Sequence, residues 1–211
     1  SIRPCPVEDL KSEAMRAEHQ RTSVILDGDL AGLSRAHRQL AVSHPSAYRR
    51  GLARAARSGY ATPKGKLWSY FYFGEAVLLH QRMRAVGLRH VHVHMSNVSA
   101  DVARLACHIG NAIDGPGSWT WSLTVHGPAD FEMIEQWDLA AKLREASGVS
   151  CISDFCRSQL MRLVEPSHWP KMKKVAMATN PDQYLPPSSR EHDGPLRLLY
   201  VGRLVPQKGG P

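Results

Sequence analysis

The feature that most constrains the fold is the regular alternation of strand-like and helix-like segments after residue 90. Short apolar runs cover residues 90–95, 121–125, 149–152 and 174–177, and helical patterns between them cover residues 97–109, 138–146 and a segment capped by Ser153. Strands separated by helices in this way form parallel sheets through crossover connections. The pattern predicts an α/β fold, a Rossmann-like parallel sheet with helices on both faces.

The first ninety residues look mainly helical. Helical patterns cover residues 9–21, 29–42, 45–59 and 67–86, and a short β-branched run at residues 22–26 is a candidate strand. Residues 61–65 read as a loop before the long fourth helix. Gly87 stands where a left-handed residue is needed to end that helix, and Leu88 can pack back onto it.

The charge balance points to an anionic partner. The 211 residues carry 27 Lys and Arg against 19 Asp and Glu, a formal net charge of +8. Six arginines gather in one helical stretch: Arg35, Arg38, Arg49, Arg50, Arg54 and Arg57. Such a field attracts phosphates, nucleic acid or an acidic membrane, although a solvated helix face explains it equally well. No apolar run is long enough to span a bilayer, and the chain starts without Met, so we expect soluble material that begins in mid-sequence.

The four cysteines do not form a metal or redox motif. They lie at positions 5, 107, 151 and 156, and no pair has the two-residue spacing of a zinc knuckle or a dithiol centre. Cys107 and Cys156 occupy core-like helix positions, and Cys151 lies within a strand. We therefore expect reduced, mostly buried thiols in a cytosolic protein.

The end of the chain predicts a second domain. Residues 1–185 are expected to form the first domain, residues 186–195 an exposed linker, and residues 196–211 the truncated start of another Rossmann-like domain. There an apolar strand runs into the sequence VGRLVPQKG (residues 201–209). Backbone N–H groups around Gly202, with the cations Arg203 and Lys208, suit phosphate oxygens.

Ligands of open parallel sheets bind beyond the carboxyl ends of the strands. Here those ends carry His94, then His126 with Gly127 and Asp130, then Ser153 at the start of a helix. Gly127 allows close backbone approach, and Asp130 can cap the next short helix. The plain alternative for His126 is a polar turn at a strand end. We expect the functional site in the cleft between the two domains.

Other kinds of site have weaker support. His90, His92 and His94 share one strand face, but at the strand rise they lie about 6.6 Å apart, too far for one zinc ion to reach all three. The sequence has no Gly-x-Ser-x-Gly nucleophile elbow, no Gly-x-Gly-x-x-Gly fingerprint and no Walker A loop. A metal-dependent hydrolase remains a minor hypothesis, and we predict no metal and no cofactor.

Three segments in this order resemble the family 4 retaining glycosyltransferases of the GT-B fold, in particular the branch that acts in colanic-acid and exopolysaccharide biosynthesis. They are HVHVH (residues 90–94), LTVHGPADF (123–131) and VGRLVPQKG (201–209), and the sequence ISDFCR (152–157) also fits. The resemblance covers residues 60 to 210 well and the first sixty loosely. The last of the three motifs is the most specific.

The resemblance implies an enzyme that transfers a sugar from a nucleotide-sugar donor to a saccharide or lipid-linked acceptor, with retention and without a metal. It places Gly202, Arg203 and Lys208 on the donor diphosphate and His126 beside the transferred sugar, as the catalytic-site residue. His94, Gly127, Asp130 and Ser153 would line the acceptor side. The partners implied are the nucleotide sugar, the acceptor and an anionic membrane, with no nucleic acid. The location implied is cytoplasmic, peripheral on the inner face of the plasma membrane.

The sequence departs from the family in three places. The expected first strand with its glycine loop precedes Ser1, the Glu-x7-Glu motif of the donor domain is missing, and Asn180-Pro181-Asp182 replaces Asn-Gly-Val-Asp. We therefore expect this stretch of chain alone to be inactive or nearly so. The alternative function is a non-catalytic, basic Rossmann-like module that docks on an anionic membrane or polymer.

Overall fold

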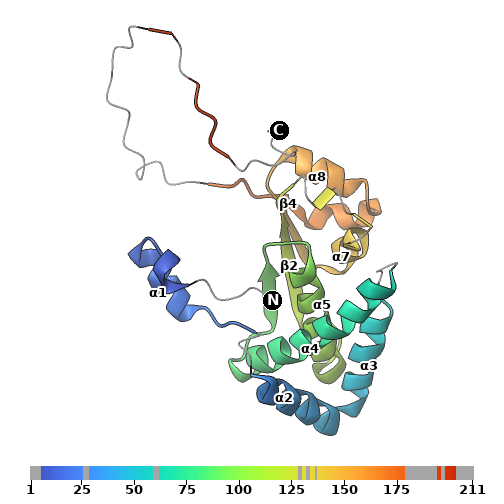
Figure 1. The fold of residues 1–211 in the computed structure, drawn as a ribbon. Coiled ribbons are helices and arrows are strands. Elements are labelled where there is room, and N and C mark those ends of the chain that lie inside the picture. The colour runs from blue at the N-terminus through green and yellow to red at the C-terminus, as the bar shows by residue number, and fades with distance from the viewer. Residues whose placement is uncertain are drawn as a thin grey trace. The chain divides into compact units, whose positions relative to one another are not determined.

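The computed structural model describes residues 6–25, 29–58, 62–127, 130–131, 134–135, 137–178, 194–195 and 198–202. The chain divides into two compact units, Ser1–Val175 and Ala176–Pro211. All the helices and strands described here belong to the first unit (Figure 1). Among the described residues, no helix is both long enough and apolar enough to cross a membrane.

The first unit is built on a parallel sheet of four strands. These are β1 (His90–Val93), β2 (Thr120–Val125), β3 (Gly148–Cys151) and β4 (Met172–Lys174). They lie side by side in chain order, and every neighbouring pair is parallel. The predicted α/β fold with a Rossmann-like parallel sheet is thus confirmed, but the predicted helices on both faces are not found: in the described part of the chain the helices that pack on the sheet cover one face. Because each strand is added on the same side of the one before it, right-handed crossover connections place the connecting helices on one face of the sheet.

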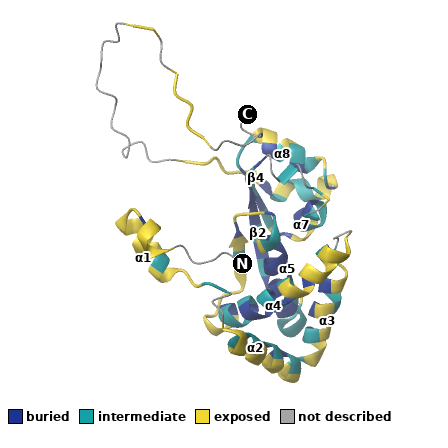
Figure 2. Ribbon diagram, viewed as in Figure 1, coloured by how far each residue is buried: buried dark blue, intermediate teal, exposed yellow. Residues whose placement is uncertain are grey.

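That face is apolar and forms the first core. It carries Val91, Val93, Trp121, Leu123, Val125, Val149, Cys151 and Met172. The connecting helices α5 (Val98–Asp114), α7 (Leu139–Glu145) and α8 (Asp154–Met161) pack against it through residues such as Ala103, Leu143 and Leu160. Figure 2 shows β2, β3 and the inner sides of these helices as largely buried, whereas much of β1, at the edge of the sheet, is exposed.

The opposite face of the sheet is polar. It carries His90, His92, Thr120, Ser122, Thr124, Ser150 and Lys173, of which His90, His92 and Lys173 are exposed. In the described part of the chain, the helices that pack on the sheet lie on the apolar face. A parallel sheet is usually covered on both sides and apolar throughout, so the polar rows mark this sheet as unusual.

A second helical layer packs on α5. It consists of α2 (Leu30–Ser43), α3 (Pro45–Ala56) and α4 (Pro63–Ala85), and it encloses a core around Leu40, Phe73, Val77 and Ile109. Gly51 of α3 lies against Phe73, where a Cβ would come within 2.7 Å of the ring. Outside these layers, α1 (Glu13–Arg21) buries none of its residues.

Local signals set most of the helix boundaries. Thr62, Asn97 and Ser153 each accept a backbone hydrogen bond as the N-cap of a helix, as their side chains favour. Pro63 occupies the first turn of α4, which therefore begins within the predicted loop 61–65. Gly87 adopts a φ of +74°, and the Leu88 N–H donates to Met83, so the predicted ending is confirmed.

Several predicted boundaries are wrong. Residues 22–25 form no strand, because Arg82 donates to Ser23 Oγ and to the carbonyls of Val24 and Ile25. The helix predicted to end at residue 109 continues to Asp114.

The last strands differ as well. β3 begins at Gly148, one residue earlier than predicted, and the N–H of the preceding Ser147 donates to the carbonyl of Trp121 in β2. The fourth strand covers Met172–Lys174, where residues 174–177 were predicted. Residues 198–201 form no strand and are exposed. The linker 186–195 lies outside the described residues except for its last two.

His80 on α4 gives the core a pH dependence. Its imidazole is 4 % exposed and packs on Trp119 with ring centroids 4.8 Å apart. Burial, reinforced by the charge of Arg84, lowers the pKa of His80 from 6.5 to about 4. Below pH 6.5 the unfolded chain therefore takes up a proton that the folded chain refuses.

We predict that the free energy of unfolding decreases as the pH falls from about 6.5 to about 4, by up to about 1.4 kcal/mol per pH unit from His80 alone. Urea unfolding at several pH values measures this slope. His80→Gln should flatten the slope below about pH 5.5, whereas His19→Gln on α1 should leave it unchanged. An equal slope in the wild type and His80→Gln would contradict the assignment.

Candidate functional site

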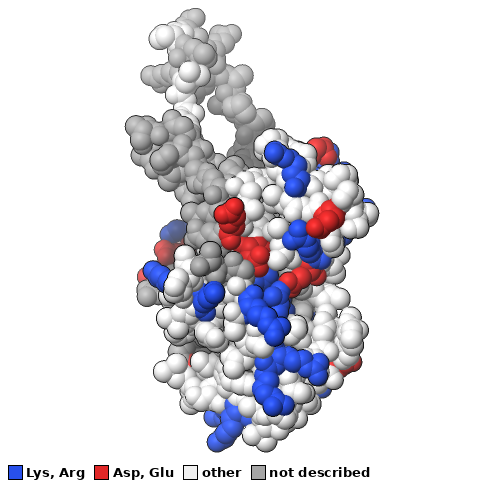
Figure 3. Space-filling view, turned by 90° about the vertical axis from the view of Figure 1, so that its right-hand side faces the viewer, with Lys and Arg blue, Asp and Glu red and all other residues white. Residues whose placement is uncertain are grey.

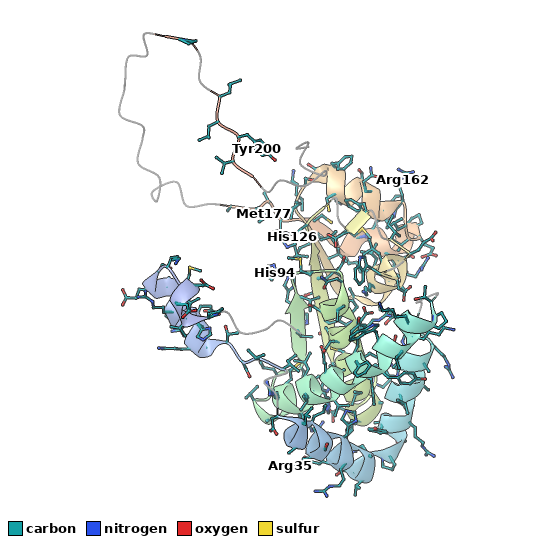
Figure 4. The ribbon with its side chains drawn as sticks, viewed as in Figure 1. Arg35, His94, His126, Arg162, Met177 and Tyr200 are labelled. Carbon is teal, nitrogen blue, oxygen red and sulfur yellow. The ribbon has the colours of Figure 1, made fainter. Side chains whose placement is uncertain are left out.

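Two histidines meet at the carboxyl edge of the sheet. His94 directly follows β1, and His126 directly follows β2. Their rings lie nearly parallel, with centroids 5.9 Å apart, and His92 meets His94 edge-on at 5.1 Å. Figure 4 shows His94 and His126 at the same end of the strands. The parallel register therefore brings together two residues that are 32 positions apart in the sequence.

The turn that carries His126 is held by one carboxylate. Asp130 Oδ2 accepts hydrogen bonds from the N–H groups of His126 and Gly127 at 3.2 and 3.3 Å, and its Oδ1 accepts from the hydroxyl of Ser96. Gly127 adopts a φ of +121°, which favours glycine. Asp130 thus fixes the loop backbone, and both its oxygens are engaged.

His126 has an unmet bonding group. Its Nε2 atom is buried and has no hydrogen-bond partner among the described residues. A buried imidazole nitrogen without a partner is costly, and such atoms mark places where a bound group can complete the pairing. His126 is therefore the residue of this edge with the clearest unfilled capacity for a ligand.

Ser153 and α8 form the next part of the edge. The Ser153 hydroxyl accepts a hydrogen bond from the N–H of Cys156 at 3.1 Å, so it caps the helix. Asp154 in the first turn pairs with Lys174 of β4 at 2.6 Å. Gly127 approaches this segment, because a Cβ on it would lie 4.0 Å from the Ile152 side chain. The edge is thus continuous from β1 to the start of α8.

A network of buried charged residues lies next to this edge and bonds to its loops. Lys142 of α7 is fully buried, and its ammonium donates to the carbonyls of Ser96 and Asn97 and to Asp101 Oδ2, at 2.8, 3.0 and 2.8 Å. Ser96 in turn donates to Asp130. The network therefore joins the loop after β1 to the turn after β2.

Arg104 extends the network toward the outer helices. Its guanidinium contacts Asp101 at 3.2 Å, Asp138 at 3.1 Å and Glu145 at 3.8 Å, and Glu145 also pairs with Arg54 of α3. Burial alone would lower the pKa of Arg104, but the surrounding carboxylates raise it. Burial lowers the pKa of Lys142, and the charge of Asp101 opposes that effect. The carboxylates therefore stabilise the positive charge at both positions.

On the polar face of the sheet, histidine rings of β1 form hydrogen bonds with hydroxyl groups of β2. His90 bonds to Thr120 and Ser122 at 2.8 and 3.0 Å, and His92 bonds to Ser122 and Thr124 at 2.8 and 2.9 Å. Burial lowers the pKa of His92, with smaller effects from His94 and His90. Both ring nitrogens of each histidine are thus paired with hydroxyls. No group of three or more His, Cys, Asp or Glu in the described ranges is arranged to hold a metal ion.

The three described cysteines are free and buried, as expected. Burial raises the pKa of Cys107 to about 12. A hydrogen bond between Cys151 and Cys156 raises the pKa of the first thiol and lowers that of the second. Cys5 lies outside the described residues.

The predicted site residues fall into two groups. The structure brings His94, His126, Gly127, Asp130 and Ser153 to one edge of the first unit. Gly202 lies in the second unit and is exposed. Arg203 and Lys208 lie outside the described residues, as does the Asn180-Pro181-Asp182 segment.

The buried charged residues were not predicted from the sequence. Lys142 follows the buried Leu139 by one turn and precedes Leu143, so it interrupts the apolar face of α7. Asp101 and Arg104 similarly interrupt the buried and otherwise apolar run 100–107 of α5. A charged residue at a core position of two facing helices is the signal that could have revealed the network.

Comparison with protein-family models, curated proteins and solved structures gave no match to this chain.

We predict that Lys142→Met lowers the free energy of unfolding by about 3 kcal/mol, because it removes the buried cation that pairs with Asp101 and takes one hydrogen-bond donor from each of the Ser96 and Asn97 carbonyls. Denaturant unfolding measures the change. The double variant Lys142→Met/Asp101→Leu should be less destabilised than the sum of its single variants. Lys11→Met, at an exposed position, is the control, and an equally small effect of both lysine variants would refute the prediction.

Proposed function

We propose that this chain forms the acceptor-side domain of a retaining glycosyltransferase that uses a nucleotide-sugar donor. The observation that carries the proposal is the paired His94 and His126 at the carboxyl edge, with the buried Nε2 of His126 unpartnered in a turn fixed by Asp130. The resemblance of the three motifs to family 4 glycosyltransferases supports the same reading.

Sugar transfer from a nucleotide-sugar donor requires groups that bind sugar hydroxyls and cations that stabilise the leaving diphosphate. Transfer breaks the bond between the sugar and the diphosphate, forms a bond from the sugar to an acceptor hydroxyl, and releases the nucleoside diphosphate and a proton. A neutral imidazole has one donor and one acceptor, so His126 suits orientation of the sugar hydroxyls. His94 beside it suits the acceptor.

The donor side of the proposal rests on the sequence. Arg203 and Lys208 would neutralise the negative charge that develops on the diphosphate, and Gly202 would let the backbone approach it. Two fixed cations in a closed cleft supply this stabilisation without a metal ion. The acceptor would be a polysaccharide or a lipid-linked saccharide, which fits an exopolysaccharide pathway and a cytoplasmic, peripheral location on the inner face of the plasma membrane.

We predict that Arg203→Ala and Lys208→Ala each lower kcat by about a hundredfold, because each removes a cation that stabilises the transition state. His126→Ala should lower it by about tenfold or more, since the sugar loses an orienting group. The assay follows nucleotide-sugar turnover by the protein that contains this chain, over a panel of donors. Binding of each nucleotide sugar is measured in parallel.

Arg162→Ala, at the end of α8, is the matched control and should leave turnover unchanged. Wild-type turnover in the Arg203 and Lys208 variants would refute the proposed diphosphate site. Absence of binding and turnover with all nucleotide sugars would refute the glycosyltransferase proposal itself.

A further inference from the structure

The first turns of α4 expose an aromatic stripe. Leu67, Trp68 and Phe71 are 59 %, 47 % and 57 % exposed, and the rings of Trp68 and Phe71 lie 5.2 Å apart. With Lys64 they follow the spacing i, i+3, i+4 and i+7, so they share one face of the helix. Tyr70, 45 % exposed, flanks this face. The other side of α4 packs on α3 and α5, so the stripe is a surface feature of a fixed helix.

Cations surround the stripe. Lys64 and Lys66 are exposed at the start of α4, and Arg57 is exposed at the end of α3. The two helix ends are joined, since Ser58 bonds to Ser69 at 2.6 Å. None of these three cations is in an ion pair with a described residue. Figure 3 shows Lys and Arg gathered on the face of the molecule to which α3 belongs.

The cations of this surface outnumber the acidic group on the same face of α4. Glu75 continues the same face one turn further on, is half-buried, and has its pKa raised mainly by that burial. Glu145 is engaged by Arg54 and Arg104. The stripe therefore presents exposed aromatic rings within a net positive rim.

The size of the stripe limits what can cover it. A fully buried aromatic side chain contributes about 150–250 Å², so three rings that are half exposed offer roughly 300 Å². A stable protein interface needs about 800 Å² from each partner. Shallow insertion into a bilayer interface needs only a few such side chains with basic residues beside them, and Trp and Tyr favour that environment.

We propose that the surface formed by Leu67, Trp68, Tyr70 and Phe71, with Lys64, Lys66 and Arg57, docks this chain on a bilayer of anionic phospholipids. The aromatic side chains enter the headgroup region, and the three cations contact lipid phosphates and acidic headgroups. This surface and the carboxyl edge of the sheet consist of different residues, so the proposal does not depend on sugar transfer.

The test is cosedimentation of the 211-residue chain with vesicles. We expect binding to vesicles of roughly three parts phosphatidylcholine and one part phosphatidylglycerol, and at least about tenfold weaker binding to phosphatidylcholine alone. Raising the salt concentration from about 0.05 M to about 0.5 M should weaken binding to the anionic vesicles by about tenfold or more.

Variants separate the stripe from the overall charge. Trp68→Gln/Phe71→Gln and Lys64→Glu/Lys66→Glu should each weaken binding at least about tenfold, whereas Trp68→Tyr should retain it. The matched controls are Phe155→Gln and Arg162→Glu, at exposed positions of α8, and they should bind like the wild type. Circular dichroism confirms that each variant is folded.

Three results would overturn the proposal. The first is equal binding to neutral and anionic vesicles, or none to either. The second is wild-type binding by the Trp68/Phe71 double variant. The third is an equal loss in the α8 controls, which would mean that the net charge alone drives association.

Discussion

The buried ammonium of Lys142 is the interaction on which the candidate site depends. A buried charged group is tolerated only when hydrogen bonds and an opposite charge replace its contacts with water. Here two carbonyls from the loop after β1 and one carboxylate from α5 accept the hydrogen bonds of the ammonium. The same loop holds Asp130 through Ser96, and Asp130 holds the backbone of His126. The position of His126 therefore depends on a lysine that does not touch it.

The order of the strands explains the unequal faces of the sheet. Because β1 to β4 advance in one direction, the crossover helices gather on one side, and the apolar side chains of the strands point there. The other face meets no crossover helix in the described part of the chain, and it carries hydroxyls and imidazoles. The imidazoles of β1 form hydrogen bonds with the hydroxyls of β2, so these polar groups have partners within the sheet.

Sequence reasoning succeeded where the information was local. The cap Ser153 and the terminating Gly87 act within one helical turn, so each was predicted from its neighbours, whereas the cap Thr62 was assigned to a loop. The alternation of elements likewise sufficed for the parallel sheet. It failed for residues 22–25, whose β-branched run suggests a strand, because the side chain of Arg82, far along the chain, bonds to that segment.

The candidate site divides in the same way. His94, His126 and Ser153 were recognisable because strand ends and helix starts are local features. The roles of Lys142 and Arg104 were not, since each is defined by a partner that only the fold supplies: Lys142 bonds to Asp101, 41 positions away in the sequence. The position of Asp130 in the turn could be predicted from the sequence, but its hydrogen bond with Ser96 could not.

Strands that pair in chain order also affect how the molecule is made. Each strand needs only the strand and helix that precede it, so every pairing closes a loop of a few tens of residues. The entropy of such closures grows slowly with loop length, and a low mean separation between contacting residues favours fast folding. We expect the sheet to assemble from β1 toward β4 while the chain emerges from the ribosome, with α7 and Lys142 completing the carboxyl edge only after both loops they join have been synthesised.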